Sequence, residues 1–315
     1  MRKVYIKDLK VSDVLLSHNF AVKEFTKKKG KTGKEYFNVT LSDKTGQVNA
    51  KVWGTNFNEV DQNAKAGDVV SVTGRVDEFL EKPQVIIEKM KIVKDFDPAD
   101  FLVKGERDQD EIWKEIQDEV SDLKDKAIKD LINKIFSDEK FVKKYKEVPA
   151  AEIVHQDYIG GLLEHTYEMM VVARTCKNLY TQVRWAELLY GVLFHDVGKV
   201  EELNPTGVTL ERTKSGALLG HLIQGLLFLD KQFPKDFDAE KKDRLLHMVA
   251  SHNGKKELGS PVVPMTLEAI LLSAIDDLSF MVGAYFTHIR KNDADDRGLT
   301  GYNRYLGASM LLNDY

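Results

Sequence analysis

The stretch LLYGVLFHDVGKVEEL, residues 188–203, places a histidine and an aspartate side by side directly after an apolar run. Its leucines and valine recur at helical spacing, which predicts a core helix that ends at His195 and Asp196. Burying an imidazole and a carboxylate without partners is costly, and the usual remedies are a hydrogen bond or a metal ion. The stretch therefore predicts a core helix that ends at a polar centre, and the rest of the chain must show whether a hydrogen-bond partner or a metal satisfies it.

Further polar residues of the same two types recur through the C-terminal part: His165, His221, His252 and Asp276. From His165 through His195 to Asp276, the gaps are 30, 26, 31 and 24 residues. Each gap fits one helix, a turn and part of the returning helix, so the side chains can converge in a bundle core, where facing helices build metal sites. One such histidine is usually a satisfied core residue. Four histidines with two aspartates instead favour a site for Mn, Fe, Co or Ni, and suit Mg less well.

Helical periodicity covers most of the C-terminal part, residues 111–315, and the interruptions NPTG and SPVVP mark loops. We expect helices over 110–136, 159–181, 184–196, 214–233, 238–252 and 265–291.

The first 94 residues are β-rich by alternation and turn chemistry. EYFNVTL and QVNAKVW alternate on either side of the turn SDKTG, where Gly46 supplies a permissive backbone. Three more strands, and a short helix-like insert before the fourth strand, predict a small five-stranded barrel, the OB-fold. Residues 95–110, acidic and broken by Pro98, read as a linker. The chain is thus expected to be multi-domain, with an all-β barrel followed by an all-α bundle.

Charge is distributed unevenly between the two parts. Residues 1–94 carry 18 Lys and Arg against 12 Asp and Glu, while the remainder carries 28 against 38. A basic barrel on an acidic body suggests a polyanionic partner, although solvated surface charge gives the same count. OB-folds bind single strands by stacking bases on aromatic side chains along a basic groove. Our candidates for nucleic-acid contacts are Tyr36, Asn49, Lys51, Trp53, Lys28, Lys29 and Lys31; the lysine cluster alone is more often a solvated hairpin tip.

The amino-acid composition limits the class of protein and its compartment. The chain has 315 residues, of which 43% are hydrophobic and 30% charged, with a net charge of −4 and one cysteine, Cys176. A single cysteine excludes an intramolecular disulfide and suits a reducing compartment. With no signal-like N-terminus or long apolar run, we expect a cytoplasmic protein without a membrane partner. The apolar segment YLGASMLL packs either internally or between subunits, which leaves a homo-oligomer open.

The ordered set H…HD…H…H…D, with Lys199 in HDVGK, resembles the HD-domain metal-dependent phosphohydrolases. An OB-fold, a linker and an HD domain in this order resemble the YhaM-type 3′→5′ exoribonucleases over nearly the full chain. The resemblance implies hydrolysis of single-stranded RNA, or single-stranded DNA, to nucleoside monophosphates with one or two divalent ions, Mn²⁺ foremost.

The resemblance also implies roles for individual residues. One metal would be held by His165, His195, Asp196 and Asp276, and Asp196 would bridge to a second metal held with His221 and His252. Lys199 would bind a nonbridging phosphate oxygen. Asp277 would serve as a proton shuttle or support a ligand, and a helix cap or an ion pair is the equal alternative.

Two positions depart from the pattern, and two other functions stay open. Asn253 stands where many relatives have a second histidine, and Ser279 where relatives often have an aspartate. An HD phosphohydrolase of a small nucleotide, namely a dNTP, a cyclic nucleotide or an alarmone, would use the same ligand set. The other alternative is a non-catalytic nucleic-acid-binding protein, in which the helical domain is a structural platform with a degenerate site.

Overall fold

The computed structural model describes residues 4–30, 33–80, 82–97, 100–101, 107–150, 158–206, 208–292 and 294–312. The chain divides into two compact units, Met1–Lys104 with Pro205–Glu211 and Gly105–Asn204 with Arg212–Tyr315. The division at Lys104 falls within the stretch expected to be a linker.

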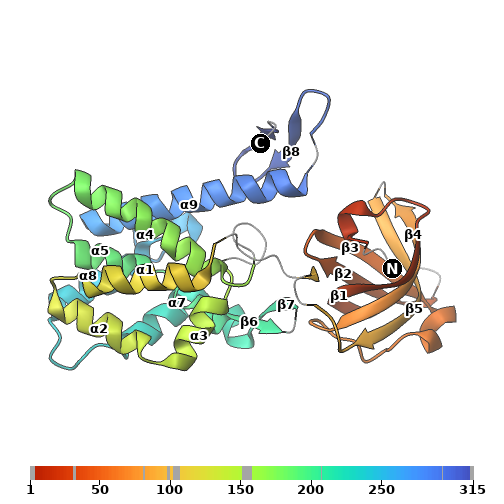
Figure 1. Ribbon diagram of the computed structural model, residues 1–315, viewed down its shortest axis with the longest axis horizontal. Helices are drawn as coiled ribbons and strands as arrows, with labels where there is room; N and C mark the ends of the chain where they lie inside the picture. The colour runs from red at the N-terminus through yellow and green to blue at the C-terminus, as the bar shows by residue number, and fades with distance from the viewer. Residues whose placement is uncertain are drawn as a thin grey trace. The chain divides into compact units, whose positions relative to one another are not determined.

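The N-terminal unit is a closed five-stranded barrel with the strand order β1-β2-β3-β5-β4 (Figure 1). All neighbouring strands are antiparallel except β3 and β5, which pair in parallel. This confirms the OB-fold barrel predicted from the alternating segments. The strands are β1 (Val14–Lys29), β2 (Glu35–Asp43), β3 (Gly46–Trp53), β4 (Val69–Phe79) and β5 (Lys82–Val93), with the 3-10 helices η1 (Ile6–Asp8) before β1 and η2 (Gly54–Glu59) before β4.

Alternation places one face of every strand inside the barrel. In β3 the inward residues Val48, Ala50 and Val52 are buried, as predicted. The turn between β2 and β3 departs from expectation, because the positive-φ glycines do not include Gly46. The Asp43 carboxylate makes this turn instead, accepting bonds from the backbone N–H and the hydroxyl of Thr45 at 2.7 and 2.6 Å.

The C-terminal unit is a helical bundle with two short hairpins. Aspartate or threonine side chains cap the N-termini of six of its described helices, α1, α2, α3, α7, α8 and α9. The helices are α1 (Gln109–Ser121), α2 (Lys126–Phe136), α3 (Glu139–Glu147), α4 (Gly161–Leu179), α5 (Trp185–Phe194), α6 (Lys199–Glu202), α7 (Lys214–Asp230), α8 (Ala239–Ser251) and α9 (Leu267–Lys291).

One expectation for this unit was wrong in detail. The segment 110–136 is two helices, because Asp125 caps a new helix by accepting from the N–H of Ile128. The unit is helical as predicted, and it also carries the short hairpin of β8 (Leu299–Asn303) and β9 (Ala308–Leu311) beside the end of α9 (Figure 1).

A second hairpin is divided between the two units. Its strands are β6 (Leu203–Thr206) and β7 (Thr209–Arg212), and its tip, residues 205–211, groups with the barrel unit. Val208 in this tip is buried in a small apolar cluster with Ala21, Val69 and Phe101. The chain therefore crosses between the units at Lys104, Asn204 and Glu211.

Helix α9 passes the length and composition test for a membrane span, with a mean hydropathy of 1.5 over Leu267–Ile289. It nevertheless packs against α4, α5 and α8 and carries Asp276 and Asp277 midway along its length. We therefore treat it as a bundle helix with a large exposed apolar face, formed by Ile270, Leu278, Met281, Val282 and Phe286. The homo-oligomer that the segment YLGASMLL left open stays a prediction.

Candidate functional site

The bundle brings the six predicted metal ligands together in two adjoining groups. One group is formed by His165, His195 and Asp276, and the other by Asp196, His221 and His252. Within each group, the potential ligand atoms lie within 4.8 Å of one another. The six side chains come from α4, the end of α5, α7, the end of α8 and α9. They therefore converge in the core of the bundle, as their spacing in the sequence predicted.

Helix ends set the orientation of two of the histidines. His195 is the C-cap of α5 and His252 the C-cap of α8. Their Nδ1 atoms lie 3.0 and 2.8 Å from the carbonyl oxygens of Val192 and Val249, three residues earlier. A carbonyl only accepts, so Nδ1 carries the proton of the neutral ring and Nε2 presents its lone pair to the centre.

Ser279 orients a third histidine, His165. The Nδ1 atom of His165 lies 3.0 Å from Ser279 Oγ, and that hydroxyl donates to Glu168 Oε2 at 3.2 Å. The serine hydroxyl thus links the Glu168 carboxylate to the His165 ring. Sequence reasoning missed Glu168, although it lies one helical turn after His165 on α4.

Asp196 lies between the two groups of ligands. Its Oδ2 is 3.4 Å from His195 Nε2, and its Oδ1 is 3.4 and 3.6 Å from the Nε2 atoms of His221 and His252. The Oδ1 atom is buried and has no hydrogen-bond partner among the described residues. An orphaned carboxylate oxygen facing two imidazole nitrogens is the arrangement expected where a cation binds.

Charged neighbours keep the two carboxyl groups of the centre ionised. Burial opposes ionisation of both Asp196 and Asp276. For Asp196, the neighbouring Lys199 and then His195 outweigh burial and hold the pKa of its carboxyl well below the ordinary range. For Asp276, the adjacent histidines do so, His165 foremost, and its pKa is likewise lowered. Burial lowers the pKa of His252 to about 4, which keeps its ring neutral near pH 7. Burial also disfavours protonation of His195, but Asp196 and Asp276 raise its pKa overall.

These features fit a divalent transition metal. The Nε2 atoms of His165 and His195 lie only 3.2 Å apart, and two facing lone pairs need a proton or a cation between them. Imidazole nitrogens with carboxylate oxygens are the donor set that Mn, Fe, Co and Ni accept. Clusters of this composition in an HD domain suggest divalent metal binding, and the identity of the metal is not determined by them.

Lys199 and Asp277 have different surroundings from each other. The Lys199 ammonium contacts Asp196 Oδ2 and the Ala150 carbonyl oxygen, and its side chain is 12% exposed. Asp277 is exposed and belongs to neither ligand group. The phosphate contact expected of Lys199 and the proton transfer expected of Asp277 both stay predictions.

The barrel presents its own cluster of candidates on the outer face of β1, β2 and β3. Directly paired residues share a face of a sheet, and the register aligns Lys28 with Tyr36 and Tyr36 with Trp53. The rings of Tyr36 and Trp53 are 5.5 Å apart, and Trp53 is 41% exposed. The Lys51 ammonium lies 5.4 and 5.5 Å from the centres of these two rings.

Sequence reasoning missed one member of this cluster. Phe79, at the end of β4, is half-exposed, and its ring centre is 4.6 Å from the Lys51 ammonium. Asn49, Lys28 and Lys29 are exposed, as a surface contact requires. Lys31 lies outside the described residues.

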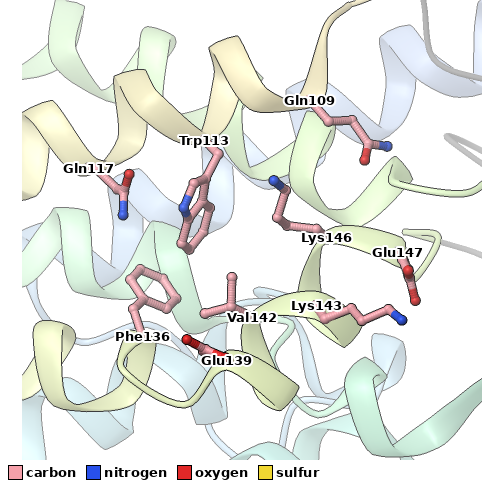
Figure 2. Close-up of a pocket in the computed structure, with 9 residues that line it drawn as sticks. All are labelled: Gln109, Trp113, Gln117, Phe136, Glu139, Val142, Lys143, Lys146 and Glu147. Carbon is pink, nitrogen blue, oxygen red and sulfur yellow. The ribbon is translucent and has the colours of Figure 1, made fainter.

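A separate cavity of about 420 Å³ lies among α1, α2 and α3 (Figure 2). Trp113 and Phe136 line it, with ring centroids 4.9 Å apart, and the Lys146 ammonium lies near Trp113 while pairing with Asp110. No residue of either ligand group lines this cavity. It is therefore not part of the His/Asp centre.

Comparison with known proteins finds one domain in the barrel and another in the helical bundle. Residues 22–93 match the OB-fold nucleic acid binding domain, and residues 162–281 match the HD domain. The chain is 29% identical over 267 residues to the 3′-5′ exoribonuclease YhaM of Oceanobacillus iheyensis, covering 81% of this chain and 80% of that protein. The chain is a homologue of this exoribonuclease. All six residues of the His/Asp centre fall within the match to the HD domain.

Solved structures are only weakly similar to this chain. A domain of replication protein A from Methanococcus maripaludis is 21% identical, with a TM-score of 0.25, and covers 30% of this chain and 97% of that chain. The OB domain of Ta0387 from Thermoplasma acidophilum is 18% identical, with a TM-score of 0.23, and covers 33% and 92%. Scores this low support no further argument.

Proposed function

We propose that this protein is a metal-dependent 3′→5′ exoribonuclease that hydrolyses single-stranded RNA to nucleoside monophosphates. The observation that carries the proposal is the buried Oδ1 of Asp196, which faces His221 and His252 and has no hydrogen-bond partner among the residues that the structure describes. The chain is also homologous to an exoribonuclease. Polarity and RNA preference come from that homology, and single-stranded DNA is a second substrate of the same chemistry.

The six ligand residues would hold one or two divalent ions, most suitably Mn²⁺, with Asp196 shared between the groups. When bound, such ions supply a nucleophilic water at neutral pH and stabilise charge on the phosphate. The Lys199 ammonium neutralises Asp196 on the side away from His221 and His252. The OB domain would bind the strand by stacking bases on Tyr36 and Trp53.

The test is a time course on 5′-labelled single-stranded RNA with Mn²⁺, comparing the wild-type protein with Asp196→Asn. The matched control is Asp243→Asn, which removes an exposed carboxylate of α8. We expect the wild type and the control to shorten the RNA from its 3′ end, and Asp196→Asn to leave it intact. Equal cleavage by Asp196→Asn would refute the metal site, and no cleavage by the wild type would leave the small-nucleotide phosphohydrolase to be tested on dNTPs.

A further inference from the structure

Glu202 is a buried carboxylate beside the metal centre that neither ligand group includes. It ends the short helix α6, is 5% exposed, and its Oε2 lies 3.4 Å from His221 Nδ1. The same imidazole turns its Nε2 towards Asp196 Oδ1, also at 3.4 Å. The His221 ring therefore lies between two carboxylates, with its Nδ1 facing Glu202 and its Nε2 facing Asp196.

His221 needs such an anchor more than the other histidines do. Helix α7 breaks immediately before it, at Gly220, where φ is +70° and ψ is 162°. A glycine in this region interrupts the regular backbone that would otherwise fix the side-chain direction. The His221 side chain is also 26% exposed, whereas those of His165, His195 and His252 are at most 1% exposed.

Packing between α6 and α7 holds the backbones of the two residues in place. A Cβ atom at Gly198 would lie 1.9 Å from the His221 carbonyl oxygen, so the chain before α6 touches the backbone of His221. A Cβ atom at Gly216 would lie 2.5 Å from the Glu202 carbonyl oxygen, which also accepts from the Thr213 N–H at 2.8 Å. Because both backbones are fixed, the adjacent Glu202 side chain is the group that sets the orientation of the His221 ring.

We infer that Glu202 is a positioning residue that fixes His221 as a ligand of the second metal, the one shared with Asp196 and His252. A carboxylate oxygen 3.4 Å from Nδ1 favours the tautomer that keeps the proton on Nδ1, which leaves the Nε2 lone pair free and makes that nitrogen a stronger donor. The other histidines of the centre rely on carbonyl oxygens or on a serine for this purpose. Removing the Glu202 carboxylate should therefore weaken one metal site and spare the other.

This inference rests on the proposed metal centre, so its test reads metal binding directly. Metal-free, full-length protein is titrated with Mn²⁺ while the free ion is followed by electron paramagnetic resonance. The variant is Glu202→Gln, which keeps the shape of the side chain. The control is Glu201→Gln, on the same short helix, whose side chain is 61% exposed and pairs with Lys144.

We expect Glu202→Gln to weaken one of two Mn²⁺ sites about 10- to 100-fold, with the other site within about twofold of wild type. Glu201→Gln should bind both ions as the wild type does. RNA cleavage by Glu202→Gln should need a correspondingly higher Mn²⁺ concentration and approach the wild-type kcat when Mn²⁺ is saturating, which general misfolding would not allow.

Two results would overturn the inference while sparing the proposed function: unchanged binding of both ions by Glu202→Gln, or equal weakening of both sites together with a lower melting temperature. If the wild-type protein binds no Mn²⁺ at all, the proposed Mn²⁺ centre itself fails. The two failures are therefore distinguishable in a single set of titrations.

Discussion

The His/Asp centre of the HD domain and the outer face of the OB barrel organise their candidate residues in opposite ways. In the centre, buried side chains hold one another in position, and the single carboxylate of Asp196 faces three histidines. On the barrel, exposed rings and lysines stand along neighbouring strands and contact one another in pairs. The contrast teaches that loss of one residue should abolish function in the first region and only reduce it in the second.

The largest effect is expected from Asp276→Asn. This change removes the carboxylate that lies 3.3 Å from His165 Nε2 and keeps the volume of the side chain. We expect kcat on single-stranded RNA to fall at least about 10³-fold, or about 4 kcal/mol, because a ligand of the centre is lost. Single-turnover kinetics would measure this, with Asp243→Asn as the control; a residual rate within tenfold of wild type would show that the centre is not interdependent.

Acid should destabilise the metal-free protein through His252. Its pKa is about 4 in the folded chain, below the value of about 6.5 expected when unfolded. Stability is therefore full above about pH 6.5 and falls as the pH drops towards 4, because only the unfolded state then takes up the proton. Between pH 7 and 5 the cost is about 2 kcal/mol from this histidine.

Urea unfolding of metal-free protein, followed by helical circular dichroism at pH 7 and pH 5, measures this effect. His252→Gln should lose about 2 kcal/mol less than the wild type over the same interval. Equal losses in the two proteins would show that His252 does not remain neutral in the folded bundle.

A smaller effect is expected from Trp53→Ala on the barrel. Stacking of a base on an exposed aromatic ring contributes about 1–3 kcal/mol, so affinity for single-stranded RNA should fall about 5- to 150-fold. Fluorescence anisotropy with labelled RNA would measure it, using Tyr180→Ala, a half-exposed aromatic of the bundle, as the control. Complete loss of binding would contradict the graded behaviour assigned to this surface.

The smallest effect is expected from single lysines near the β1–β2 hairpin. Lys28→Gln should lower the slope of log affinity against log salt by about 0.7, as one phosphate contact on a single strand predicts. Lys27→Gln is the matched control, because the Lys27 ammonium already lies 2.7 Å from Glu35 Oε2. Equal slopes for Lys28→Gln and the wild type would remove Lys28 from the binding surface.

The sequence was informative where a pattern repeats over many residues. Alternation in β2 and β3 predicted the barrel, since each inward residue is matched by an outward polar neighbour. The spacing of histidines and aspartates likewise predicted that His165 and Asp276 would meet, although 111 residues separate them.

Short elements and supporting residues escaped the sequence for a physical reason. The hairpin β6–β7 has four-residue strands, and α3 depends on a cap by Asp138, so neither offers a long periodic signal. Glu202 reads as one of two solvated glutamates in GKVEEL, and Glu168 as one polar residue on α4. Only the folded packing separates the buried Glu202 from the exposed Glu201.

The β6–β7 hairpin has a consequence for the inheritance of the two domains. Because Val208 belongs to an apolar cluster with Ala21, Val69 and Phe101, the barrel unit is completed by a segment encoded within the HD domain. Recombination that exchanged residues 1–94 alone would pair a foreign barrel with the original hairpin tip. The two domains are therefore expected to have been inherited and to diverge as one unit, with the composition of the hairpin tip changing alongside that of the barrel.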